Sequence, residues 1–111
     1  MNGRRNHSPQ MVMDLARQGK IAFTSSVRKR LVERYDKVPQ KFCQELLTNL
    51  GKAEFLKKVT LDDGKKCDVY RCSYPDADDS DESFWYVKFT IIEAMGLIFL
   101  LSCKIDGETR Y

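Results

Sequence analysis

Histidine is almost absent from this sequence, because its 111 residues contain a single one, His7, near the N-terminus. One imidazole excludes a metal centre built from several histidines and a catalytic pair of histidines. The four cysteines, at positions 43, 67, 72 and 103, form no Cys-x-x-Cys pair and are too sparse for a disulfide framework. We therefore expect reduced thiols, no metal site and no cofactor.

Long apolar runs are also missing, since no stretch approaches the ~18 residues that a membrane-spanning helix needs. The polar N-terminus carries Arg4 and Arg5 but is not followed by the apolar segment of a signal peptide. With 42% hydrophobic and 32% charged residues, the chain has the composition of a globular protein. We expect one domain spanning residues 1–111, in the cytoplasm and away from membranes.

Positive charge is concentrated in the first half of the sequence. Residues 1–57 contain 12 Lys or Arg and 5 Asp or Glu, a net charge of +7, whereas residues 58–111 contain 7 and 11, a net charge of −4. Basic surfaces attract phosphates, so the first half is where we expect contact with an RNA backbone. A solvated helix face is the alternative explanation for the same charges.

The first half also contains the signals for three short helices after a flexible tail at residues 1–7. Ser8 and Pro9 predict the start of a helix that ends at Gly19, and residues 21–23 suggest a brief strand. A second helix, capped by Thr24 or one of the two serines after it, carries the basic stripe Arg28, Lys29, Arg30 and Arg34. A third helix is predicted from Pro39 to Gly51.

From Glu54 onward the hydrophobic period changes to two, which indicates strands. We predict four strands, at residues 54–61, 66–74, 83–93 and 97–105. The segment 75–83 contains five acidic residues and little apolar material, which indicates a solvated loop. The fold class is therefore α+β, with three short N-terminal helices packed on a twisted, mainly antiparallel sheet.

The loop between the last two strands decides which of their side chains meet. A three-residue loop that ends at Gly96 would place Tyr86 opposite Lys104 and Lys88 opposite Ser102, all on one face. A two-residue turn would separate Tyr86 from Lys104, but the glycine favours the longer loop. The other face would then be apolar, with Trp85, Val87, Phe89 and Ile91.

For the first hairpin we also predict a three-residue loop, at residues 62–64. Lys57 would then lie opposite Val69 and Phe55 opposite Arg71, so that Lys57, Cys67 and Arg71 share a face. A two-residue Asp-Gly turn is the open alternative, and it would break this arrangement.

Four short segments resemble, in order and spacing, those of the MqsR (motility quorum-sensing regulator) toxin family. The resemblance covers roughly residues 6 to 105, and no single segment is specific. The segments are Phe55-Leu56-Lys57, Asp68-Val69-Tyr70-Arg71, Tyr86-Val87-Lys88-Phe89-Thr90 and Phe99-Leu100-Leu101-Ser102-Cys103-Lys104.

The resemblance implies a RelE-like ribonuclease fold and the activity of an mRNA interferase, a toxin that cuts messenger RNA at short GC-containing motifs and arrests growth. It also implies a cognate antitoxin, zinc-binding or helix-turn-helix in type. The family's functional lysine, tyrosine and last lysine fall on Lys57, Tyr86 and Lys104. The family's glutamine position holds Cys67, whose thiol cannot make the two directed hydrogen bonds of an amide.

Metal-independent cleavage of RNA needs a base for the 2′-hydroxyl, positive charge at the phosphate and an acid for the leaving 5′-oxygen. We assign Lys104 or Lys57 as the base and Tyr86 as the acid or a positioning hydroxyl. Arg71 would clamp the phosphate, with Lys88 and Cys67 as further substrate contacts. Cys67 is a more natural strand residue than a nucleophile. The alternative function is a non-catalytic RNA- or protein-binding module with a degenerate site.

Overall fold

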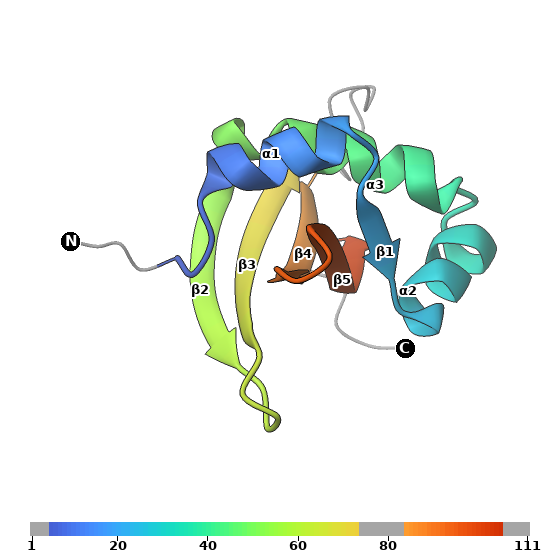
Figure 1. The fold of residues 1–111 in the computed structure, drawn as a ribbon. Helices are drawn as coiled ribbons and strands as arrows, with labels where there is room; N and C mark the ends of the chain where they lie inside the picture. Colours follow the sequence, from blue (N-terminus) through green and yellow to red (C-terminus); the bar gives the residue numbers. More distant parts are fainter. Residues whose placement is uncertain (1–4, 74–83, 106–111) are drawn as a thin grey trace.

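A computed structural model of the chain describes residues 5–73 and 84–105. This part of the chain forms three α-helices and one five-stranded sheet, which confirms the α+β class (Figure 1). The predicted acidic loop at 75–83 lies outside the described residues. The elements are α1 (Pro9–Arg17), β1 (Ile21–Phe23), α2 (Ser25–Lys29), α3 (Pro39–Thr48), β2 (Glu54–Thr60), β3 (Lys66–Ser73), β4 (Phe84–Ile92) and β5 (Leu97–Ile105).

The predicted helix starts are confirmed by their caps. The Ser8 hydroxyl accepts a hydrogen bond from the Met11 amide at 3.4 Å, and the Thr24 hydroxyl accepts one from the Val27 amide at 3.1 Å. Gly19, after α1, has a φ of 76°, as a helix-ending glycine requires.

The predicted end of the third helix at Gly51 is wrong. The α-helix α3 stops at Thr48, and the chain continues through a 3₁₀ turn at Leu50–Lys52 that includes this glycine. The Asn49 side chain donates a hydrogen bond to the Glu45 carbonyl at 3.0 Å and so satisfies one of the carbonyls at the helix end. The tighter turn buries Leu50, which lies in the core with the apolar face of α3.

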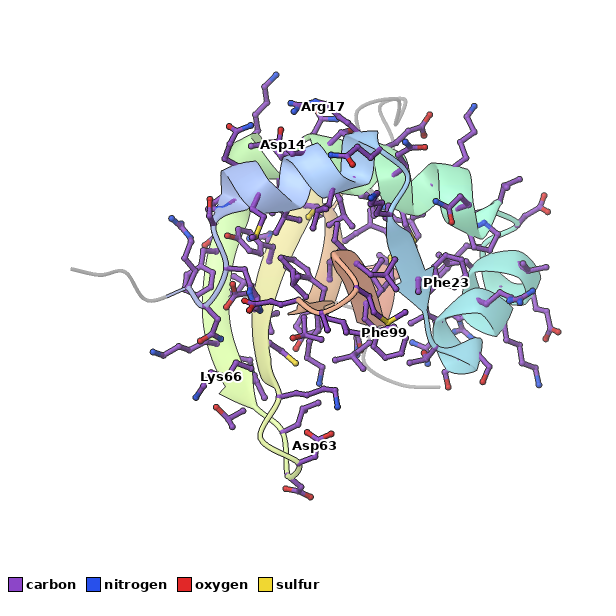
Figure 2. All side chains as sticks on the ribbon, in the orientation of Figure 1. Asp14, Arg17, Phe23, Asp63, Lys66 and Phe99 are labelled. Carbon is purple, nitrogen blue, oxygen red and sulfur yellow. The ribbon has the colours of Figure 1, made fainter. Side chains whose placement is uncertain are left out.

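The sheet has the strand order β1-β5-β4-β3-β2. Strand β1 runs parallel to β5, and the other three neighbouring pairs are antiparallel, which confirms a mainly antiparallel sheet. Helices α1 and α3 lie together over one face of the sheet, and α2 lies beside β1 (Figure 1). The Asp14–Arg17 ion pair, at 2.9 Å, is on the outer side of α1 (Figure 2).

The core fills the space between the helices and this face of the sheet. Trp85 of β4 packs edge-on against Phe42 of α3 and Tyr35, with ring centroids 4.7 and 4.8 Å apart. The predicted inward face of β4 is confirmed, because its alternate residues are all buried: Trp85, Val87, Phe89 and Ile91.

The register of the first hairpin is confirmed only near its turn. Lys57 pairs with Val69, as predicted, but Phe55 pairs with Tyr70 instead of Arg71 because the register shifts by one residue at Leu56. Such a bulge reverses which residues face the core. Here it turns the Phe55 ring toward the Tyr70 ring, with the centroids 5.4 Å apart.

The second hairpin reaches the predicted pairing by a different route. Ile92 pairs with Leu97, so the loop has four residues and the predicted three-residue loop is wrong. A register shift at Leu101 adds one residue to β5 and compensates for the longer loop. Tyr86 therefore lies opposite Lys104, as predicted.

Residues 1–7 were predicted to form a flexible tail, and the structure places Asn6 and His7 in contact with β3. Their backbone amides donate hydrogen bonds to the Asp68 carboxylate, at 2.7 and 3.0 Å from Asn6 and 2.9 Å from His7. The Asn6 side chain also donates to the Cys67 carbonyl at 3.0 Å. Asp68 has no exposed surface, so this part of the N-terminal segment provides partners that a buried carboxylate needs.

Candidate functional site

The face of the sheet opposite the helices carries two rows of mainly polar side chains that cross neighbouring strands. In the first row, called here the Tyr86 row, Arg71 of β3 pairs with Tyr86 of β4, which pairs with Lys104 of β5. The second, the Lys57 row, consists of Lys57, Val69, Lys88 and Ser102 in strands β2 to β5. Along β3 and β4 the rows are two residues apart, or roughly 7 Å. All the predicted catalytic residues thus lie in two adjacent rows.

Tyr86 and Lys104 are in direct contact within the Tyr86 row. The Lys104 ammonium lies 5.3 Å from the centroid of the Tyr86 ring, a cation–π distance. Both side chains are half-buried, so each has one part fixed by the sheet and another accessible from outside. A ligand atom on this face can therefore reach an ammonium group and a phenol hydroxyl from neighbouring strands.

Arg71 is held on the other side of Tyr86 by two contacts. Its Nη1 atom lies 3.3 Å from Oε1 of Glu54, the residue opposite it on β2. Its guanidinium carbon lies 4.7 Å from the centroid of the Phe84 ring. These contacts orient the planar guanidinium beside Tyr86, where it can meet an anion with two parallel hydrogen bonds.

The Lys57 row adds two more cations to the same face. Lys57 is exposed and Lys88 is half-buried, and the residue between them, Val69, is buried. Together with Arg71 and Lys104, the two rows present four positive side chains, and among the described residues of these rows the carboxylate is that of Glu54. The register therefore places the four predicted cations on the same face as Tyr86, with Arg71 and Lys104 directly beside it.

Cys67 lies on the same face but is withdrawn from solvent. It pairs with Val59 of β2 and has no exposed surface. Burial raises the pKa of the Cys67 thiol, although the nearby Lys88 ammonium opposes this rise. Cys67 is also four residues from Arg71 along β3, or roughly 13 Å. The geometry therefore offers its thiol neither as a nucleophile nor as a surface for a ligand.

Two more residues, Phe84 and Glu54, belong to this site. Phe84 is exposed at 44% and stands two residues before Tyr86, so strand alternation places its ring on the same face. Glu54 enters the Tyr86 row only because of the bulge at Leu56, and nothing in the local sequence marks that bulge. The alternation of side chains along β4 therefore indicates the position of Phe84, whereas no sequence signal indicates the position of Glu54.

Further observations on the described part of the chain concern metal ions, membranes and relatives. Within residues 5–73 and 84–105, His, Cys, Asp and Glu side chains nowhere gather in groups of three or more that could hold a metal ion. None of the helices in these ranges has the length and apolar composition needed to cross a bilayer. No family model, curated protein or solved structure matches this chain.

Proposed function

We propose that this protein is the toxin of a type II toxin–antitoxin pair, with a RelE-like fold and the activity of an endoribonuclease. Its substrate would be cytoplasmic messenger RNA, cut at short GC-containing motifs. The observation that carries the proposal is the Tyr86 row, in which Arg71, Tyr86 and Lys104 lie side by side on three strands. The resemblance of the surrounding segments to the MqsR family supports it.

The proposed reaction is a transphosphorylation that uses side chains alone. A base removes the proton of the ribose 2′-hydroxyl, and the 2′-oxygen attacks the adjacent phosphorus. The bond from phosphorus to the 5′-oxygen breaks, and an acid protonates this oxygen. The products are a 2′,3′-cyclic phosphate and a 5′-hydroxyl end, with no net gain or loss of protons.

We propose the following division of roles. Lys104 or Lys57 acts as the base, and Tyr86 is the acid or positions the leaving oxygen. Arg71 and Lys88 stabilise negative charge on the phosphate oxygens, as fixed cations do in such transition states. The exposed Phe84 ring offers a surface on which a neighbouring base can stack. Because Cys67 is buried, we assign it no direct contact with the substrate.

A second candidate function is a non-catalytic module that binds RNA or protein. Two observations favour it. The family's glutamine position is occupied by the buried Cys67, and Glu54 places a carboxylate 3.3 Å from the proposed phosphate clamp Arg71. This function predicts binding to the same face without cleavage.

The deciding experiment is induced expression in a bacterial host, with growth curves and mapped messenger-RNA 5′ ends. We expect wild type to arrest growth and to produce new ends at one short motif. Lys57→Ala should remove both effects, whereas Lys58→Ala should retain them. Lys58 is the matched control because it is also exposed on β2 but points to the opposite face. If none of the strains yields new ends, the binding module is the correct function. A neighbouring gene for a zinc-binding or helix-turn-helix protein would identify the antitoxin.

Replacing Glu54 by glutamine should strengthen RNA binding. The Glu54–Arg71 ion pair competes with a phosphate for the guanidinium, and its loss should raise affinity about two- to fivefold, the range of an exposed ion pair. Fluorescence anisotropy with a non-cleavable 2′-O-methyl RNA oligomer measures the change. Glu45→Gln removes the same charge from α3, where Glu45 pairs with Lys41 at 3.8 Å, and is the control. An equal gain in both variants would show that net charge alone is responsible.

A further inference from the structure

Two adjacent hollows lie next to the Tyr86 row, at α2 and the helical turn that follows it. The first has a volume of about 240 Å³ and is bounded by Ser102 and Lys104 of β5 on one side and by Ser26 and Arg30 on the other. The second has a volume of about 300 Å³, and Ser26 and Arg30 also line it. The two hollows therefore share a wall, and the first opens directly beside the proposed base Lys104.

The lining of these hollows is strongly cationic and contains hydroxyl groups. Among the described residues, the charged side chains that line the first hollow are those of Arg30 and Lys104. The second hollow adds Lys29 and Arg34, and the acidic residue among its described lining residues is Glu33. Guanidinium, ammonium and hydroxyl donors in one groove are the groups that bind phosphate oxygens.

The local helix geometry brings these cations to one face. After α2 the chain makes a π-helical turn at Arg30–Arg34, closed by a 3.3 Å hydrogen bond from the Tyr35 amide to the Arg30 carbonyl. Such turns are rare and are found frequently at functional sites. The turn begins at Arg30, the charged residue common to both hollows.

We propose that these two hollows bind phosphate groups of a single-stranded RNA that extends beyond the cleaved linkage. The inference rests on the proposed function and deepens it, because it assigns the path of the strand next to Lys104. Arg30 is the central contact, with Ser26 beside it as a hydroxyl donor. Three residues of the basic stripe line the hollows, namely Lys29, Arg30 and Arg34. The fourth residue, Arg28, lines neither hollow.

The test is equilibrium binding of a 2′-O-methyl RNA 12-mer to the full chain over a series of salt concentrations. Arg30→Gln should weaken binding about tenfold, the effect of losing one charge-assisted hydrogen bond. It should also reduce the slope of log K against log salt by about 0.7, the value for one single-strand phosphate. Arg28→Gln removes the same charge from α2 outside both hollows and should change affinity by about twofold at most.

A second pair of variants keeps the test valid if Arg30→Gln fails to fold. Ser26→Asp places a negative charge in both hollows, whereas Ser25→Asp places it on the same helix turn outside them. Both serines are exposed, so neither change disturbs the core. Only Ser26→Asp should weaken RNA binding, by about tenfold.

The outcomes separate this inference from the proposed function. If wild type binds RNA but each hollow variant behaves like its control, the inference is wrong, whether or not RNA is cut. If the hollow variants weaken binding and no RNA is cleaved, the inference stands and the nuclease proposal fails. Binding of a polyglutamate of equal charge as tightly as RNA would indicate an acidic protein partner and overturn the inference.

Discussion

Lys104→Ala and Tyr86→Phe should each slow the cleavage of RNA by purified protein about a hundredfold or more, the usual cost of removing one acid–base or charge-stabilising group. The two side chains touch, with the ammonium 5.3 Å from the ring centroid. They act on the same transition state, so the double variant should be little slower than the worse single variant. Single-turnover rates at saturating protein concentration measure the chemical step without the effect of weaker binding.

Tyr86→Phe and Lys58→Ala together show whether a loss of rate arises from this site. Tyr86→Phe keeps the aromatic ring beneath the ammonium and removes only the hydroxyl, so it tests proton transfer or positioning and not packing. Lys58→Ala loses one positive charge outside the site and should keep most of the wild-type rate. Full activity in Lys104→Ala would exclude this lysine as the base and leave Lys57 as the remaining candidate.

Asp68→Asn should lower the free energy of unfolding by about 2 to 3 kcal/mol, because the buried carboxylate accepts hydrogen bonds from two backbone amides of the N-terminal segment. An asparagine has one acceptor oxygen and would place an amide donor against those N–H groups. For a chain of this length the loss corresponds to a fall in Tm of roughly 10 °C. Thermal unfolding followed by circular dichroism measures it.

The N-terminal segment provides the internal control for this prediction. A chain that begins at Ser8 lacks the partners of Asp68 and should be destabilised by a similar amount. Asp68→Asn should then have little further effect, because both changes remove the same interaction. Asp63→Asn, near the exposed tip of the β2–β3 hairpin (Figure 2), should leave Tm close to that of wild type. An undiminished effect of Asp68→Asn in the shortened chain would show that other groups hold the carboxylate.

Much of the fold was predictable because the signals that define it are local. Caps at Ser8 and Thr24 and the alternation in β4 depend on neighbouring residues, and each was confirmed. The end of α3 and the anchoring of Asn6 and His7 were not predicted. These features arise from tertiary contacts, such as the need of Asp68 for hydrogen-bond donors from a segment about 60 residues away in the sequence.

The candidate site was predictable to the extent that it follows strand register. The number of residues between Tyr86 and Lys104 determines that they pair across neighbouring strands, so this pairing could be predicted from the sequence. The approach of Glu54 to Arg71 depends on the bulge at Leu56, and this bulge leaves no mark in the alternation of the sequence. The position of Arg30 beside Lys104 depends on how α2 packs against β5, which the local sequence does not show.

The paired irregularities of the β4–β5 hairpin determine which side chains of β5 enter the core. The observed hairpin has a four-residue loop and a bulge at Leu101. A three-residue loop without a bulge would use the same number of residues between Tyr86 and Lys104. Without the bulge, residues 97–101 would be shifted by one position, which would turn the buried side chains of Ile98 and Leu100 to the outer face. The core therefore holds the hairpin in the observed arrangement, in which Tyr86 and Lys104 lie opposite each other.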